Sequence, residues 1–212
     1  MSANRSIYIV GLTGGIASGK SEAAKYLEGL GAHCVDADEI SRALTADGGP
    51  LLPSIREEFG DGVFFPDGSL DRPALANLVF SDPEKRRRLD ALTHPSIQKA
   101  MLDEVDEAEQ AGEKLVFLNV PLLFETGMDV LCDETWLVSA DEDVQKERLM
   151  RRDHMSLDDA EKRIDAQMSL EEKLRRAKVV IDNSRSIDRM YGELQSLYAG
   201  LLKRVSRMEN DK

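Results

Sequence analysis

The sequence predicts an α/β protein in which a doubly wound, parallel, five-stranded sheet carries a helical insertion and a lid. Five short apolar stretches alternate with longer amphipathic ones over much of the chain, which is the pattern of repeated β–α units. A glycine-rich segment, residues 14–21, comes directly after the first apolar stretch and opens the first amphipathic one. This order of strand, loop and helix is what a phosphate-binding loop requires.

The glycine-rich segment reads Gly14-Gly15-Ile16-Ala17-Ser18-Gly19-Lys20-Ser21 and fits the pattern G-x-x-x-x-G-K-[ST]. Glycines let the loop turn its backbone N–H groups inward, and the N-terminus of the following helix attracts anions. We expect Lys20 to reach the β- and γ-phosphates of a nucleotide and the Ser21 hydroxyl to bind Mg²⁺. A glycine turn before an ordinary helix is the alternative, but the preceding strand, residues 7–10, favours a nucleotide site.

The second predicted strand, residues 31–36, leads into two carboxylates, Asp36 and Asp38. Ligands of open parallel sheets bind at the carboxyl ends of the strands, so we expect these acids beside the phosphate loop. One of them is expected to cap the helix over residues 39–44, and Asp38 is the preferred candidate for a functional role.

Residues 47–112 lack the alternation of strands and helices, and they predict a helical insertion. We expect helices over residues 51–59, 71–80, 82–93 and 95–111, with a capping box at Ser81 and Glu84. The cationic run of residues 85–88 is interpreted as a solvated helix face, with contact to an anionic substrate as the alternative. His94-Pro95 is placed at a helix junction, where His94 is either structural or a donor to a ligand.

The central predicted strand, residues 115–120, is followed by Pro121-Leu122-Leu123-Phe124-Glu125. We expect the apolar side chains of this segment to wall a pocket, although a strand that runs into a helix cap is the alternative. Two more strands are predicted over residues 135–140 and 179–181. The last helix, residues 187–208, is expected to pack on the core through apolar residues at helical spacing: Met190, Leu194, Leu197, Leu201, Leu202 and Val205.

A lid is predicted between the last two strands. Its short helices are rich in arginine, and two of them open with capping boxes at Ser156 and Ser169. Arg148 and Arg152 are four residues apart and therefore share one helix face. A solvent-exposed helix with paired charges is the alternative. The predicted domains are a nucleotide-binding core (residues 1–46, 113–140 and 177–212), the insertion (47–112) and the lid (141–176).

Composition limits the classes of function. The net charge of −12 argues against a sequence-independent nucleic-acid binder, which needs a basic face. No apolar run has the length of a membrane span or of a signal peptide, so we expect a cytoplasmic protein. Cys34 and Cys132 have no metal-type spacing and are interpreted as small core residues.

Three classes of protein with a phosphate-binding loop remain to be separated. A GTP-binding switch protein is expected to carry N-K-x-D and D-x-x-G, and neither occurs in this chain. A motor or transport ATPase usually has an apolar strand that ends in Asp, whereas here the strand ends near Asn119. The small-molecule kinases, with an acid near the loop and an arginine-rich lid, match best.

Within that class, a series of segments resembles the dephospho-coenzyme A kinase family over residues 7–184. The segments come in the family's order: Gly11-Leu12-Thr13-Gly14-Gly15, Asp36-Ala37-Asp38 with Arg42, His94-Pro95, Pro121-Leu122-Leu123-Phe124-Glu125, Gln145-x-x-Arg148-x-x-x-Arg152-Asp153, Ala166-Gln167 and Ile181-Asp182-Asn183. The chain departs from the usual family residues at Ala17, Glu22, Asn119 and Lys178. Alanine in place of the family's usual glycine at position 17 is expected to cost little stability if the φ of Ala17 is negative.

The resemblance implies transfer of the ATP γ-phosphate to the ribose 3′-hydroxyl of dephospho-CoA, the last step of coenzyme A synthesis, with Mg²⁺ as the metal. It implies catalytic roles for Asp38, Lys20 and Arg148. Nucleotide contacts are expected from Gly14, Gly15, Ile16, Ala17, Ser18, Gly19, Lys20, Ser21, Arg152 and Asn183, and metal binding from Ser21. The resemblance also implies that the helical insertion, residues 47–112, binds dephospho-CoA. Individual acceptor contacts are expected from Asp38, Arg42, His94, Pro121, Leu122, Leu123 and Glu125.

Two other functions stay open at this point. One is a kinase of similar architecture that acts on another nucleoside or nucleotide. The other is a regulatory module that binds ATP without transferring its phosphate. We expect dephospho-CoA as a small-molecule partner, no nucleic acid or membrane as a partner, and a monomer, with an oligomer left open.

Overall fold

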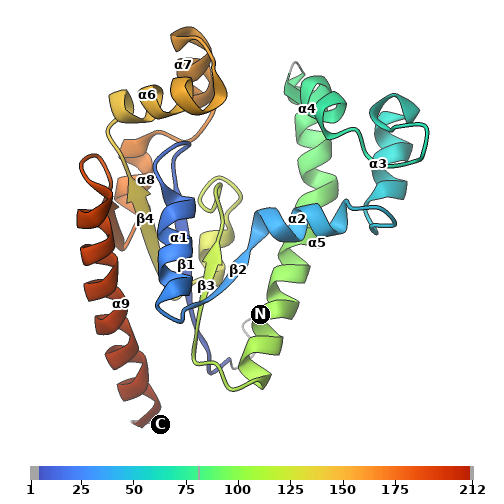
Figure 1. Ribbon diagram of the computed structural model, residues 1–212. Helices are drawn as coiled ribbons and strands as arrows, with labels where there is room; N and C mark the ends of the chain where they lie inside the picture. The colour runs from blue at the N-terminus through green and yellow to red at the C-terminus, as the bar shows by residue number, and fades with distance from the viewer. Residues whose placement is uncertain (1–4, 81, 211–212) are drawn as a thin grey trace. The chain divides into compact units, whose positions relative to one another are not determined.

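The computed structural model describes residues 5–80 and 82–210 (Figure 1). It divides into two compact units, residues 1–35 with 105–212 and residues 36–104. The first unit holds most of the sheet and the helices that cover it, and the second is helical. Within the described residues, no helix is long and apolar enough to cross a membrane.

The sheet has five strands in the order β2-β3-β1-β4-β5, with the phosphate loop at the end of the central strand. The strands are β1 (Tyr8–Gly14), β2 (His33–Asp36), β3 (Leu115–Asn119), β4 (Glu134–Ser139) and β5 (Val179–Asp182). The pairs β1–β3, β1–β4 and β4–β5 are parallel, and Leu12 lies opposite Asn119 across the first of them. The predicted parallel five-stranded sheet is therefore confirmed.

Helices cover both faces of this sheet. On one face, α1 (Lys20–Gly29) and α9 (Ile187–Asn210) share a core with Val10, Phe117 and Trp136 of the strands. On the other face, α8 (Leu170–Arg176) packs against β4, and the Thr135 hydroxyl donates to its last carbonyl, 3.3 Å away. Successive side chains of a strand point to opposite faces, so Trp136 faces α1 and α9 while Thr135 faces α8.

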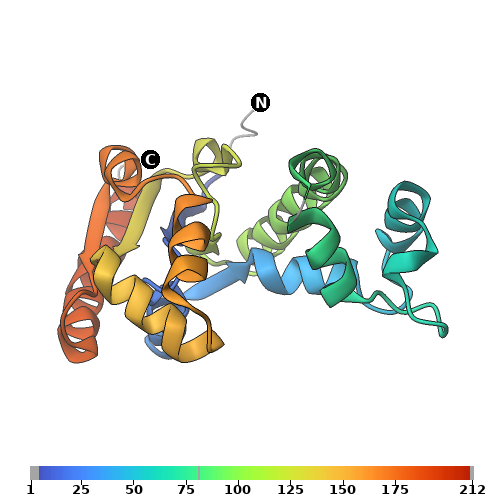
Figure 2. The same cartoon turned by 90° about the horizontal axis from the view of Figure 1, so that it is seen from above.

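The lid helices are α6 (Glu142–Asp153), α7 (Leu157–Asp165) and α8. Helices α6 and α7 lie side by side at the carboxyl end of the sheet (Figures 1 and 2). The serine N-cap that each predicted capping box begins with is confirmed. The Ser156 hydroxyl accepts from the Asp159 N–H at 3.2 Å, and the Ser169 hydroxyl accepts from the Glu172 N–H at 3.2 Å.

The final helix corrects one predicted core position. Leu202 is 42% exposed, while Tyr198 is buried. The buried stripe of α9 follows residues 194, 198, 201 and 205, and position 202 falls one residue outside it. Cys34 and Cys132 are half-buried, and burial raises the pKa of the Cys132 thiol to about 12.

The second unit contains α2 (Ala37–Leu44), α3 (Leu52–Phe59), the short 3₁₀ helix η1 (Asp61–Val63), α4 (Arg72–Phe80) and most of α5 (Pro83–Gln110). A second 3₁₀ helix, η2 (Met128–Leu131), belongs to the first unit. A small core joins the helices of the second unit through Leu51, Ile55, Val63, Phe64 and Leu75. This core gives the unit an apolar centre of its own.

The prediction of two helices separated at His94-Pro95 was wrong, because α5 runs through both residues. Proline removes one backbone donor and typically costs about 3 kcal/mol in a helix interior. Burial on both sides offsets this cost: Leu89 and Leu92 pack on the small core, and Val105 and Ala108 are buried further along. The predicted cap Ser81 lies outside the described residues, and the Asp82 carboxylate accepts the N–H groups of Glu84 and Lys85.

The cationic run at the start of α5 is a solvated helix face in this structure. Lys85 pairs with Asp82, Arg87 with Glu84, and Arg88 with Glu58 and Glu84. The side chains of Arg87 and Arg88 remain 70% and 58% exposed. Exposed pairs of this kind add little stability.

Candidate active site

Two glycines give the phosphate loop its conformation. Gly19 precedes α1 with φ 98°, and a Cβ at this residue would lie 2.1 Å from the Asn183 amide nitrogen. A Cβ at Gly14 would lie 2.5 Å from the Ser18 hydroxyl. No side chain of the described residues caps the first turn of α1. The helix therefore presents an uncapped N-terminus beside the loop, which is the arrangement that binds phosphate.

Ala17 does not meet the condition of a negative φ under which it would cost little, because its φ is 57°. An L-residue in the left-handed region typically costs about 1–2 kcal/mol relative to its right-handed conformation. The next residue closes a turn, with the Ser18 N–H 3.0 Å from the Gly15 carbonyl. The loop thus adopts the same local shape that a glycine would take without strain.

Four side chains bind the backbone of the loop from outside it. Two of them hold Ile16: Gln145 of α6 donates to its carbonyl at 2.9 Å, and Gln167 accepts from its N–H at 2.9 Å. Asn183 donates to the Ser18 carbonyl at 2.7 Å, and Arg148 lies 3.4 Å from the same oxygen. The loop geometry is therefore fixed by residues far away in the sequence.

Gln145 and Gln167 were missed as site residues in the sequence. Both occur in segments that resemble the family, which is the only signal that could have drawn attention to them. A glutamine carries no charge and no preferred partner, so its residue type does not predict a bond to the backbone of residue 16. Gln145 is buried and lies close to Gly15, where a Cβ would come within 2.6 Å of its amide nitrogen.

Two polar atoms at the loop have no hydrogen-bond partner among the described residues. These are the Ser18 hydroxyl oxygen and the side-chain oxygen of Asn183, and both are buried. An unsatisfied buried polar group typically costs about 1–3 kcal/mol. A ligand or water that supplies these partners would therefore bind favourably beside the loop.

Lys20 is 8% exposed, and its ammonium donates to the side-chain oxygen of Asn119 at 2.6 Å. Asn119 stands at the end of β3, opposite Leu12 of the central strand. Since the amide is neutral, this contact orients the ammonium without cancelling its charge. The contact thus places the ammonium beside the loop, where it can reach a phosphate.

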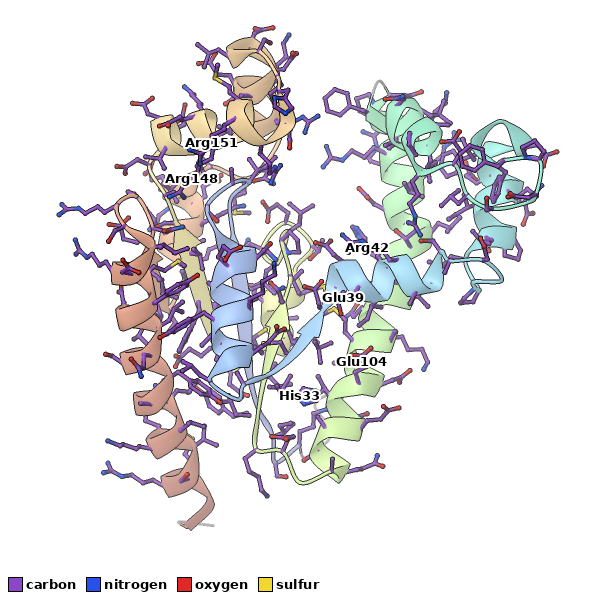
Figure 3. The ribbon with its side chains drawn as sticks, in the orientation of Figure 1. His33, Glu39, Arg42, Glu104, Arg148 and Arg151 are labelled. Atoms are coloured by element: carbon purple, nitrogen blue, oxygen red, sulfur yellow. The ribbon has the colours of Figure 1, made fainter. Side chains whose placement is uncertain are left out.

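The two lid arginines that were predicted to bind the nucleotide, Arg148 and Arg152, behave differently. Arg148 of α6 is half-buried and donates to the Asn183 carbonyl at 2.9 Å and, at 3.4 Å each, to the Ala17 and Ser18 carbonyls (Figure 3). Arg152 instead makes a bidentate contact with Asp153 at 2.7 and 2.9 Å. This contact raises the pKa of Arg152 and lowers that of Asp153. Only Arg148 contacts the loop in this conformation.

The segment after β3 lies under the lid. Leu123 is fully buried, Phe124 is nearly so, and the side chain of Leu123 packs over Gly11. Glu125 accepts from the Met168 N–H at 3.1 Å and pairs with the buried ammonium of Lys173 at 2.9 Å. Pro121 and Leu122 are half-buried. In this conformation Glu125 therefore anchors the start of α8, and Leu123 is a packing residue.

A cavity of about 210 Å³ lies between the loop and the lid helices. Gly15 lines it on the side of the loop, and Gln145, Gln167 and Lys173 line it on the side of the lid. The two glutamines that hold Ile16 thus also form part of the cavity wall. A change in the lid would reach the loop through these side chains.

In the helical unit, the Asp36 carboxylate caps α2 by accepting the N–H groups of Asp38 and Glu39, at 2.7 and 3.1 Å. The expectation that one of the two acids is a cap is therefore confirmed. Asp38 and Arg42 are exposed on α2, and neither side chain contacts another described residue through a hydrogen bond or ion pair. His94 lies 3.5 Å from Asp90 inside α5.

Comparison with known proteins decides the family. A family model described as dephospho-CoA kinase matches residues 8–189. The chain belongs to the dephospho-CoA kinase family. A relative from Symbiobacterium thermophilum, named dephospho-CoA kinase, is 47% identical over 90% of this chain and 80% of its own length. One of the same name from Bacillus licheniformis is 44% identical over 89% of this chain and 94% of its own length.

Solved structures agree with the family assignment and with the fold. A dephospho-CoA kinase from Campylobacter jejuni has a TM-score of 0.69 and 26% identity, covering 92% of this chain and 97% of its own. A shikimate kinase from Acinetobacter baumannii has a TM-score of 0.52 at 16% identity, covering 94% of this chain and 96% of its own, which shows the fold alone. The architecture is thus that of the small-molecule kinases with a phosphate loop.

Proposed function

We propose that this chain transfers the γ-phosphoryl group of ATP to the ribose 3′-hydroxyl of dephospho-CoA, giving coenzyme A and ADP. Membership of the dephospho-CoA kinase family is the observation that supports dephospho-CoA as the acceptor. The phosphate loop leads into the uncapped N-terminus of α1, and this supports the choice of a nucleoside triphosphate as donor. The proposal includes a cytoplasmic, monomeric enzyme, with an oligomer left open, and sedimentation would test the monomer.

On the donor side, the loop residues 14–21 hold the phosphates of ATP, and Lys20 neutralises charge on the β- and γ-phosphates. Ser21 at the exposed start of α1 supplies one oxygen ligand for Mg²⁺. The described residues contain no group of His, Cys, Asp or Glu side chains that would hold a metal by itself. This fits Mg²⁺, which usually keeps several waters and binds through substrate phosphates with one or two protein ligands. The ion supplies charge neutralisation along the phosphate chain.

On the acceptor side, Asp38 orients the 3′-hydroxyl and accepts its proton as the new bond forms. The ribose oxygen bonds to the γ-phosphorus, the bond from that phosphorus to the bridging oxygen breaks, and ADP leaves. General-base help of this kind is typically worth about 10²–10⁴-fold in rate. Arg42, His94 and the segment Pro121, Leu122, Leu123 and Glu125 complete the proposed acceptor site.

Arg148 stabilises the charge on the moving phosphoryl group when the lid closes, with Arg152 as a further nucleotide contact. The guanidinium of Arg148 lies within 3.4 Å of the loop carbonyls, which supports this assignment. To reach the phosphates it must exchange those carbonyls for phosphoryl oxygens, a charge-assisted contact that is stronger. Asn183, whose amide oxygen lacks a partner among the described residues, is assigned to the nucleotide.

The test is a coupled assay for ADP with ATP, Mg²⁺ and a panel of acceptors: dephospho-CoA, adenosine, AMP and shikimate. We expect the highest kcat/KM with dephospho-CoA, and phosphorus NMR of the product should place the new group on the 3′-oxygen. A higher kcat/KM with another acceptor would refute the proposal. Slow ATP consumption that no acceptor changes would favour a regulatory module.

A further inference from the structure

Two carbonyls of the phosphate loop are bound from outside the loop by side-chain amides. The Ile16 carbonyl accepts from Gln145 of α6 at 2.9 Å. The Ser18 carbonyl accepts from Asn183, which follows β5, at 2.7 Å. Both amide side chains are buried. The two carbonyls therefore point toward the protein rather than toward a ligand.

These bonds also set the direction of two N–H groups of the loop. A planar trans peptide directs its C=O and its N–H to opposite sides, so the Ala17 N–H points away from the bond that holds the Ile16 carbonyl. The Gly19 N–H is related to the Ser18 carbonyl in the same way. Neither N–H has an acceptor among the described residues. Unpaired N–H groups of a loop are what a phosphate oxygen binds.

The peptide between Ile16 and Ala17 is the one that most needs an outside bond. Ala17 has φ 57°, in the left-handed region that alanine disfavours, whereas Gly19 adopts its positive φ without strain. A turn of this peptide would let Ala17 take a negative φ, and it would move the Ala17 N–H out of its present direction. The bond from Gln145 to the Ile16 carbonyl opposes that turn, because the turn would break it.

Gln145 is fixed in place by its own helix. Gln145 and Leu149 are both buried and stand four residues apart, so they share the packed face of α6. The Gln145 N–H donates to the Asp141 carbonyl at 2.9 Å, at the start of the helix. Since the Ile16 carbonyl can only accept, the amide must present its NH₂ group to the loop. Helix α6 thus supplies a hydrogen-bond donor at a fixed point beside Ile16.

Gly15 points to the same arrangement independently. It is not among the described glycines with a positive φ, so its backbone would allow a side chain. A Cβ at this residue would nevertheless lie 2.6 Å from the Gln145 amide nitrogen. The three atoms nearest to such a Cβ all belong to the side chains of Gln145 and Gln167. Glycine is therefore required here by the side chains that hold Ile16.

We propose that Gln145 is a positioning residue for the donor nucleotide. By holding the Ile16 carbonyl it keeps Ala17 in the left-handed conformation, with the Ala17 N–H directed at a phosphate oxygen. The inference rests on the proposed function for the identity of the nucleotide, and it adds a neutral residue that acts through one peptide of the loop. Because such an N–H binds the substrate and the transition state alike, Gln145 should change the KM for ATP more than kcat.

The first test removes the donor and measures both substrates. Gln145→Ala should raise the KM for ATP roughly tenfold, because a hydrogen bond is lost and the peptide is free to turn, while kcat and the KM for dephospho-CoA stay within about twofold. Calorimetric titration with the β,γ-imido analogue of ATP should show the same loss of affinity without turnover. Gln145→Met keeps the length of the side chain without its donors and should behave alike. Gln195→Ala, at an exposed position of α9, is the control.

Two further substitutions test the route through the peptide. Gly15→Ala leaves α6 unchanged, but its methyl group displaces the Gln145 amide, so it should raise the KM for ATP as Gln145→Ala does. It also replaces Gln145→Ala if circular dichroism shows that variant to be unfolded. The double variant should bind no worse than the weaker single variant, since both changes break one bond. Ala17→Gly should restore the ATP affinity of Gln145→Ala by roughly twofold to fivefold, because glycine adopts a positive φ without the bond.

Four results would overturn the inference. An unchanged KM for ATP in both Gln145 variants would show that the loop keeps its conformation without the bond. Losses that multiply in the double variant would mean that Gly15 is needed for another reason. Failure of Ala17→Gly to restore affinity would contradict the role of the Ala17 conformation. A lower melting temperature with normal affinity for the imido analogue would make Gln145 purely structural. If the unmodified protein binds the analogue but does not phosphorylate dephospho-CoA, the proposed function fails and the inference on the loop stands.

Discussion

Around the phosphate loop, side chains from α6 and from residues 167 and 183 bond to the loop backbone, whereas the proposed acceptor residues on α2 extend into solvent. The loop carries Lys20 buried against Asn119, and Gln145 and Gln167 hold Ile16 from both sides. Asp38 and Arg42 make no side-chain hydrogen bond or ion pair with described residues.

This difference follows from the two chemical tasks. A phosphate chain is bound by backbone N–H groups, which have to be held in place before the ligand arrives, and preorganised dipoles stabilise charge best. A carboxylate that accepts a proton must instead be reachable by the substrate. Substitutions at the loop should therefore change both folding stability and nucleotide binding, while substitutions of Asp38 and Arg42 on α2 should change turnover or acceptor binding with little effect on stability.

The largest effect is expected for Lys20→Ala, which should abolish transfer, a loss of at least about 10³-fold in kcat/KM. The variant removes the buried charge and leaves Asn119 without this partner. The ADP assay with dephospho-CoA measures the loss, and Lys25→Ala, an exposed position on the same helix, is the control. Turnover near normal in Lys20→Ala would refute the role of the loop.

The second largest effect is expected for a substitution on α2 that should leave the phosphate loop unchanged. Asp38→Asn is expected to lower kcat by about 10²–10⁴-fold, because the amide no longer accepts a proton. Calorimetric titration should show little change in ATP affinity, since Asp38 belongs to the acceptor side. Glu39→Gln, which replaces a carboxylate by an amide at the neighbouring exposed position, is the control. Equal activity of Asp38→Asn and the unmodified protein would remove Asp38 from the mechanism.

Arg148→Ala should lower kcat by about 10²-fold, with less change in KM. Unlike Asp38→Asn, it should also lower the melting temperature, because its contacts with the Asn183 and loop carbonyls are lost. Arg151→Ala, an exposed position on the same helix, is the matched control. A change confined to KM would identify Arg148 as a ground-state contact instead.

The smallest effect is expected for Ala17→Gly. Relief of the left-handed strain, about 1–2 kcal/mol, outweighs the entropy cost of glycine, about 0.5–1 kcal/mol. The melting temperature without nucleotide should rise by about 2 °C. Ala166→Gly, at a residue with φ −73°, should lower it instead. A lower melting temperature for Ala17→Gly would show that the loop gains nothing from the freedom of glycine.

Much of the fold follows from local patterns. The five strands, the helix after the loop and both lid serine caps were predicted within a few residues, because apolar runs and caps act over short distances. The junction at Pro95 was wrong for a physical reason: proline weakens a helix locally, while burial along α5 stabilises it over many turns. Likewise, Leu202 matched the period yet lies outside the buried stripe.

The sequence by itself determined the phosphate loop, the alternation that builds the parallel sheet and the family, because these depend on residue types at fixed spacing. Only the tertiary structure decided how the loop is held. Gln145 and Asn183 donate to loop carbonyls and Gln167 accepts from the Ile16 N–H, so these hydrogen bonds connect residues more than 100 positions apart. It also decided that Ala17 has a positive φ and that the Gln145 amide lies against Gly15. Such features depend on which side chains meet in space, and no local spacing encodes that.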